Sequence, residues 1–133
     1  PIFVSNSTFT DINHVLVAFD GSLPSIRVLE YLLGGPIFGK LKISVLGVSK
    51  VKEDPLGPEQ KSLVMNLNKN QNLISFINVS GDPKDQIMRH ISDQKSDMLA
   101  IGAYGHSKLR NLFIGSTTSA LIHSSPVPVL LSK

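Results

Sequence analysis

The sequence contains no cysteine and no tryptophan, and it has only two tyrosines among its 133 residues. Without cysteine, the chain can form neither a disulfide scaffold nor a thiolate metal site, and it has no cysteine nucleophile. No apolar run approaches the roughly 20 residues that cross a bilayer, and no signal-peptide pattern is visible. We therefore expect a cytoplasmic protein that makes no membrane contact.

Candidate catalytic groups are also sparse. The four histidines, His14, His90, His106 and His123, are scattered, and none belongs to an HExxH pair or has a carboxylate at metal-ligand spacing. No Ser–His–Asp order is evident, and no two residues stand out as an acid and base pair. The sequence therefore predicts no zinc site and favours a binding protein over an enzyme, while slow nucleotide hydrolysis stays open.

The balance of charge is mildly basic, with 13 Lys and Arg against 10 Asp and Glu and a net charge of +3. Proteins that bind nucleic acid usually gather basic residues on one face and supply aromatic side chains for stacking. Here the basic residues are spread along the chain, and aromatic residues make up only 6% of it. We therefore do not expect a nucleic-acid partner.

Apolar runs alternate with helical patterns along most of the chain, whose length suits one domain. The strand-like runs cover residues 14–19, 41–48, 73–79, 98–103 and 127–131, and helical patterns lie at 24–33, 59–70, 83–94 and 116–124. Such alternation predicts an α/β fold, in which a parallel sheet carries helices on both faces. The main domain is expected over residues 13–133.

Residues 1–12 stand apart from this alternation. The stretch Pro1-Ile-Phe-Val-Ser5 is strand-like and echoes the last strand of the chain, and the polar residues after it look like a linker. Two interpretations stay open: a frayed terminus, or the last strand of a preceding copy of the same domain. In the second case the stretch pairs with residues 127–131 of its own chain or of a dimer mate.

The most informative stretch runs from Gly102 to Ser116, between an apolar run and a helical pattern. Glycine lets a ligand approach the backbone closely, and a helix start offers free N–H groups to an anion. This pattern predicts a phosphate cradle. The alternative is that the glycines only form a tight turn and that Ser116 only caps the helix. The predicted phosphate site comprises Gly102, Gly105, Gly115, Ser116, Thr117 and Thr118.

Asp20 ends the first apolar run. Its carboxylate could accept a hydrogen bond from a ribose hydroxyl or help to hold Mg²⁺ through water, or it could cap the helix that begins near Pro24. In parallel sheets, ligands bind at the carboxyl ends of strands, where the winding direction reverses. If the first and fourth strands are neighbours, Asp20 and Gly102 face one crevice.

The spacing Gly102-x2-Gly105-x9-Gly115-Ser116 resembles the nucleotide-binding signature of the universal stress protein family. The resemblance covers about residues 13–132, including the first strand with Asp20 and the turn Gly81-Asp-Pro83. It implies a Rossmann-like fold of the adenine nucleotide alpha hydrolase type. In that fold, a five-stranded parallel sheet of order 3-2-1-4-5 is flanked by four helices.

The same resemblance implies a ligand, because family members that keep the glycine signature typically bind ATP. By position, Ala18, Phe19 and Asp20 would line the adenosine, and Val48 would meet adenine through its backbone. The glycines, Ser116 and Thr117 would hold the phosphates. Two features depart from the family pattern: the segment after Val48 is short for a single-domain member, and Phe19 is bulky.

The resemblance therefore implies an ATP-binding regulatory domain of a stress-response protein, without efficient catalysis and with Mg²⁺ as a further ligand. A slow Mg²⁺-dependent ATPase and a dimerising, partner-binding module without nucleotide are the alternatives. Members dimerise through the last strand, and many consist of two fused copies. We therefore expect a homodimer or an intramolecular pair with a second copy.

Overall fold

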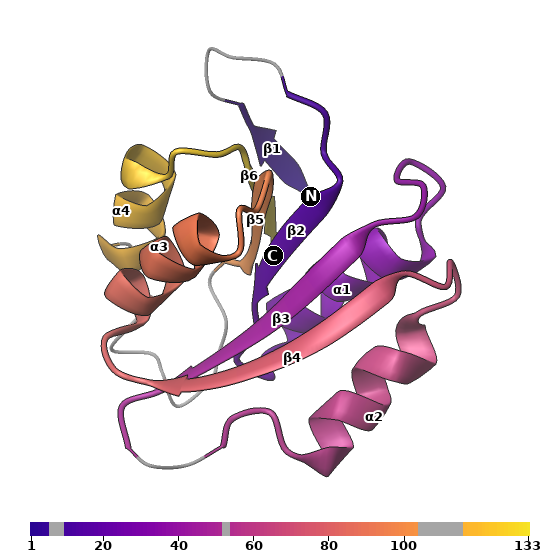
Figure 1. Cartoon of the computed structure of the whole chain (residues 1–133), viewed down its shortest axis with the longest axis horizontal. Helices are drawn as coiled ribbons and strands as arrows, with labels where there is room; N and C mark the ends of the chain where they lie inside the picture. The colour runs from indigo at the N-terminus through magenta and orange to yellow at the C-terminus, as the bar shows by residue number, and fades with distance from the viewer. Residues whose placement is uncertain (6–9, 52–53, 104–115) are drawn as a thin grey trace.

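The computed structural model describes residues 1–5, 10–51, 54–103 and 116–133, and of Ser116 and Thr117 it describes the backbone alone. These residues form one sheet with helices on both of its faces (Figure 1). The elements are β1 (Ile2–Val4), β2 (His14–Ala18), α1 (Leu23–Gly34), β3 (Lys42–Ser49), α2 (Pro58–Leu67), β4 (Leu73–Ser80), α3 (Pro83–Asp93), β5 (Met98–Gly102), α4 (Ser116–Ser124) and β6 (Val129–Ser132).

The order of the strands confirms the expected α/β fold. The described sheet runs β1-β6-β5-β2-β3-β4, and all neighbours from β6 to β4 pair in parallel. Counted in chain order, the five parallel strands therefore follow the sequence 3-2-1-4-5. The expected count of five was wrong by one strand, because β1 adds a sixth that is antiparallel.

β1 pairs with β6 of its own chain, with Ile2 opposite Leu131 and Val4 opposite Val129. Of the two pairings left open by the sequence, the structure contains the intramolecular one. β1 covers the edge of β6 that would otherwise be unpaired. β1 is therefore the edge strand at that end of the sheet. Its side chains remain accessible, since Ile2 is 59% and Phe3 is 49% exposed.

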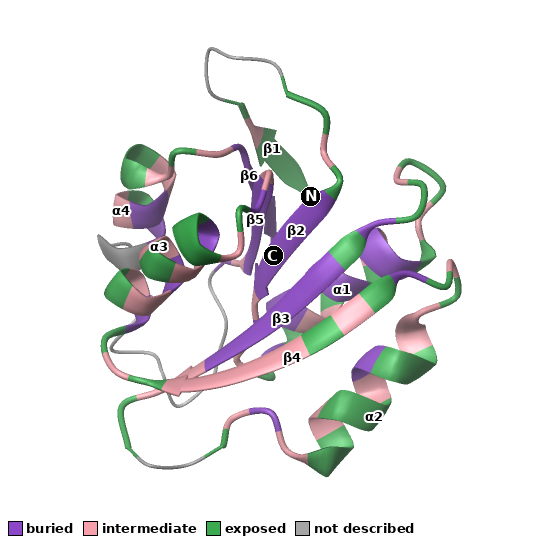
Figure 2. Ribbon diagram, viewed as in Figure 1, coloured by how far each residue is buried: buried purple, intermediate pink, exposed green. Residues whose placement is uncertain are grey.

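Two layers of core lie on the two faces of the sheet, because successive side chains of a strand point to opposite faces. Val15 and Val17 of β2 pack with α1 and α2, whereas Leu16 packs on the other face with α3 and α4. β2 is therefore buried on both sides, as its continuous apolar run predicts (Figure 2). None of the helices in the described part of the chain has the length and apolar character of a membrane span.

Candidate functional site

The carboxyl ends of three central strands meet at one edge of the sheet. β2 lies between β3 and β5, and Ala18 is in register with Leu46 on one side and Ile101 on the other. Asp20 comes two residues after the end of β2, and Gly102 is the last residue of β5, so they lie at the same edge. The structure therefore contains the neighbouring strands that the crevice argument required.

A narrow hollow of about 20 Å³ opens at this edge. Its lining includes all four residues that were expected to contact adenosine, namely Ala18, Phe19, Asp20 and Val48. Phe19 also belongs to the core on the α1 and α2 face, where it is buried. The hollow is far smaller than the several hundred Å³ of a ligand pocket, so a nucleotide base would have to widen it.

Three further residues of the hollow were not predicted: Leu46 from β3, and Pro83 and Ile87 from α3. Pro83 opens α3, and the side chain of Asp82 caps that helix by accepting from the N–H of Asp85 at 3.1 Å. The alternation of β3 places Leu46 on the same face as Val48. That pattern could have identified Leu46, but the approach of α3 depends on how the helix packs.

Asp20 organises the turn between β2 and α1. Its Oδ1 accepts a hydrogen bond from the N–H of Ser22 at 2.9 Å. The helix cap is Ser22, whose hydroxyl accepts from the N–H of Ser25 at 3.4 Å. The interpretation of Asp20 as the cap was therefore wrong by two residues, because the turn places the Ser22 hydroxyl at the helix start. Asp20 remains half-buried at the rim of the hollow.

Gly102 lies against the start of α1. A Cβ atom at this position would collide with the backbone of Ser25 and would come within 2.7 Å of the Pro24 carbonyl carbon. The close approach of β5 to α1 therefore requires glycine here, whatever the ligand. The alternative interpretation, in which the glycines have a structural role and bind no phosphate, thus has a physical basis at Gly102.

Thr118 lies in the first turn of α4 and is 7% exposed. Its Oγ1 is buried and has no hydrogen-bond partner among the described residues. The side chain lines a pocket of about 500 Å³ together with Ala103, Ile122 and Ser132. A buried hydroxyl without a partner is costly, and a phosphate oxygen would satisfy it. At this helix start, Thr118 is the described residue whose buried hydroxyl an anionic group could reach.

The rest of the predicted phosphate site lies partly outside the described residues. Gly105 and Gly115 lie outside the described residues, as does His106. Ser116 and Thr117 open α4, but their side chains are not described.

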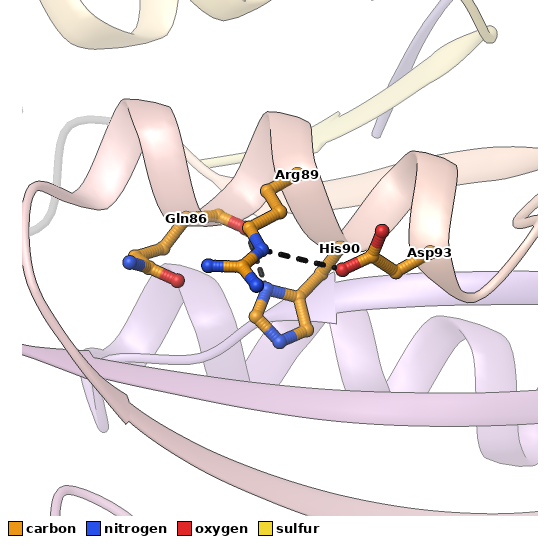
Figure 3. A network of polar contacts seen from close by, with 4 residues as sticks. All are labelled: Gln86, Arg89, His90 and Asp93. Atoms are coloured by element: carbon orange, nitrogen blue, oxygen red, sulfur yellow. Dashed lines mark hydrogen bonds and ion pairs between the residues drawn. The ribbon is translucent and has the colours of Figure 1, made fainter.

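His90 and His14 do not line the hollow. The Nδ1 of half-buried His90 donates to the carbonyl oxygen of Gln86 at 2.7 Å, and the exposed Arg89 and Asp93 pair at 3.4 Å on the same helix (Figure 3). His14 lies at the amino end of β2, the opposite end from the hollow. Within the described ranges, no three His, Asp or Glu side chains are close enough to share a metal ion.

The family model and similar curated relatives point to the same family. The model of the universal stress protein family matches residues 11–133. Over 135 aligned residues, the chain is 33% identical to universal stress protein Slr1230 of Synechocystis, and the alignment covers 98% of this chain. It covers only 46% of that relative, so the chain spans about half the length of the protein it matches.

Solved structures agree on the fold. Hypothetical protein MJ0577 of Methanocaldococcus jannaschii superimposes with a TM-score of 0.74 at 20% identity, covering 92% of this chain and 96% of that one. A universal stress protein in complex with cAMP gives 0.70 at 19% identity, covering 93% and 98%. A universal stress protein family member from Arabidopsis thaliana with AMP bound gives 0.63 at 19% identity, covering 91% of each chain.

Proposed function

The chain belongs to the universal stress protein family, and we propose that it binds an adenine nucleotide at the carboxyl ends of β2, β3 and β5. The observation that carries this proposal is the convergence of Ala18, Asp20 and Val48 on one hollow, beside Gly102. Two structures of the same fold were solved with cAMP or AMP bound, which supports an adenine nucleotide as the ligand class.

The described residues suggest how the adenosine would lie. The apolar side chains of Val48 and Ile87 would pack against the base, while the backbone of Val48 would supply polar contacts. The carboxylate of Asp20, at the rim, would accept a hydrogen bond from a ribose hydroxyl. Because a base is larger than the hollow, binding would require Pro83 and Ile87 of α3 to move outward.

The phosphates would lie toward the start of α4. We infer that the ligand is ATP, held by Gly105, Gly115, Ser116, Thr117 and Thr118, since a helix start favours negative charge. Mg²⁺ commonly binds through one or two carboxylates together with phosphate oxygens and water. Asp20 would supply the protein carboxylate, with the nucleotide supplying the other ligands.

The role we propose is regulatory, within a stress response, rather than efficient catalysis. In the described part of the chain, Asp20 is the one titratable residue that lines the hollow, so an acid and base pair is not assembled there. Slow hydrolysis would appear as Mg²⁺-dependent phosphate release in the same samples used for binding. The cytoplasmic location stays a prediction.

The pairing of β1 with β6 also supports a proposal about assembly. Because β1 occupies the edge of β6, a second chain cannot pair there without displacing it. The relative from Synechocystis is about twice as long as the matched region. We propose that β1 belongs to a preceding copy of the domain, which would make an intramolecular pair rather than a homodimer.

Isothermal titration of the chain with MgATP, AMP and cAMP tests the nucleotide proposal. We expect a Kd in the micromolar range, which corresponds to about −8 kcal/mol. Gly115→Val should abolish binding of all three ligands, since each carries phosphate, whereas Asp20→Asn should weaken the binding of each. Absence of heat and of thermal stabilisation with every nucleotide, in a chain that melts cooperatively, would refute the proposal.

A further inference from the structure

Asn78 holds the backbone of a loop residue through two hydrogen bonds. Its Oδ1 accepts from the N–H of Leu56 at 3.0 Å, and its Nδ2 donates to the carbonyl oxygen of Leu56 at 3.2 Å. Asn78 lies on β4, whereas Leu56 belongs to the connection between β3 and α2. One side chain therefore satisfies both polar groups of one peptide position, 22 residues away in the sequence.

The same loop position is seated directly on β3. Leu56 is 1% exposed and packs in the core on the α1 and α2 face. Gly47 of β3 is in register with Asn78, and a Cβ on Gly47 would come within 2.7 Å of Pro55 and 2.9 Å of Leu56. The missing side chain at Gly47 thus provides the space that Pro55 and Leu56 occupy.

This contact lies beside the candidate base contact. Val48 follows Gly47 in β3, and its side chain lines the hollow. After Val48, the carbonyl oxygen of Ser49 accepts from the N–H of Gly81 at 2.9 Å, which anchors the start of the loop. Asn78 anchors the other end at Leu56, so the loop that follows Val48 is held at both of its ends.

We propose that Asn78 is a positioning residue for the nucleotide site, which acts by holding the loop after β3 so that the backbone at Val48 stays aimed at the base. The inference rests on the proposed nucleotide binding. It assigns a role in base recognition to a side chain that does not line the hollow. A loop that is ordered before binding costs less to order on binding, so the clamp raises affinity without touching the ligand.

Asn78→Leu tests this role, because leucine has the same number of side-chain heavy atoms, also branched at Cγ, and removes both hydrogen bonds. We expect the affinity for MgATP to fall about tenfold, as two hydrogen bonds of ordinary strength allow. The ratio of ATP affinity to GTP affinity should fall, because the backbone of Val48 would be less well aligned with the base. Gly47→Ala should have the same effects, since it displaces Pro55 and Leu56 without removing any hydrogen-bonding group.

Asn68→Leu is the matched control. Asn68 makes an equivalent clamp at the opposite end of β4: its Nδ2 donates to the carbonyl oxygen of Asn72 at 2.9 Å, and its Oδ1 accepts from the N–H of Asn72 at 2.9 Å. Both asparagines are half-buried. The control should lower the melting temperature by a similar amount, but should change ATP affinity less than twofold.

The outcomes separate this inference from the proposed function. If the unaltered chain binds ATP, and Asn78→Leu retains both its affinity and its ATP-to-GTP ratio, the positioning role is refuted while nucleotide binding stands. Equal losses of affinity in Asn78→Leu and Asn68→Leu would mean general loosening of the fold, which also refutes the role. If the unaltered chain binds no nucleotide, both proposals fail.

Discussion

Replacing Thr118 by valine should raise the stability of the ligand-free protein and weaken nucleotide binding at the same time. The Oγ1 of Thr118 is buried without a hydrogen-bond partner among the described residues. An unsatisfied buried hydroxyl costs about 1–3 kcal/mol. Valine keeps the β-branched shape in the helix but removes that penalty. We therefore expect the free energy of unfolding to rise by about 1–2 kcal/mol.

The expected shift is measurable by thermal unfolding. For a chain of this size, each kcal/mol raises Tm by roughly 4 °C. If the hydroxyl hydrogen-bonds a phosphate, its loss should weaken MgATP binding roughly tenfold or more, because bonds to charged groups are the stronger ones. Both quantities can be measured on one sample by differential scanning calorimetry and isothermal titration.

Ser96→Ala provides the control, because the Oγ of Ser96 is the other buried side-chain oxygen without a partner in the described part of the chain. Ser96 is 5% exposed and precedes β5, at the amino end of the sheet. Ser96→Ala should also raise Tm, but the affinity for ATP should not change. A lower Tm for Thr118→Val, or an ATP affinity within twofold of the unaltered chain, would contradict the reasoning.

Two further predictions concern parts of the fold away from the hollow. Burial, and to a lesser extent Lys42, lower the pKa of His14 below its ordinary value of 6.5, so the unfolded chain binds protons more readily. Stability should therefore fall as the pH drops below about 6.5, and urea midpoints measured from pH 8 to pH 5 should show a shallower fall in His14→Gln. Deleting residues 1–8 removes three β1–β6 residue pairs, so we expect a loss of about 1–2 kcal/mol or a new dimer through β6. An unchanged Tm and elution volume would argue against the second prediction.

The alternation of apolar runs and helical patterns was sufficient to predict the fold class and the approximate bounds of most elements. The helix starts were visible because Pro24 and Pro83 suit the first turn of a helix, although the cap of α1 is Ser22 and not Asp20. The edge at which the candidate site lies followed from the general behaviour of parallel sheets. The strand order, by contrast, came from the family resemblance, since local patterns do not specify which strands are neighbours.

Contacts between residues distant in the sequence could not be predicted. The clamp from Asn78 to Leu56 and the approach of Pro83 and Ile87 to the hollow depend on the packing of whole elements. Ser44 is a similar case: it is fully buried in β3, where its hydroxyl lies 2.8 Å from the Nε2 of His14. A polar residue in a strand gives no local signal that it will find a partner on the neighbouring strand.

Gly102 and Thr118 differ in what they reveal about the ligand. Gly102 belongs to the glycine signature, but the backbone of Pro24 and Ser25 already requires glycine there. Any chain with this approach of β5 to α1 would keep that residue, with or without nucleotide. A substitution at Gly102 would therefore disturb folding and binding together. No packing requirement explains the hydroxyl of Thr118, because valine would fill the same space. Opposite changes in stability and affinity at Thr118 are consequently the sharper test of a phosphate site at the start of α4.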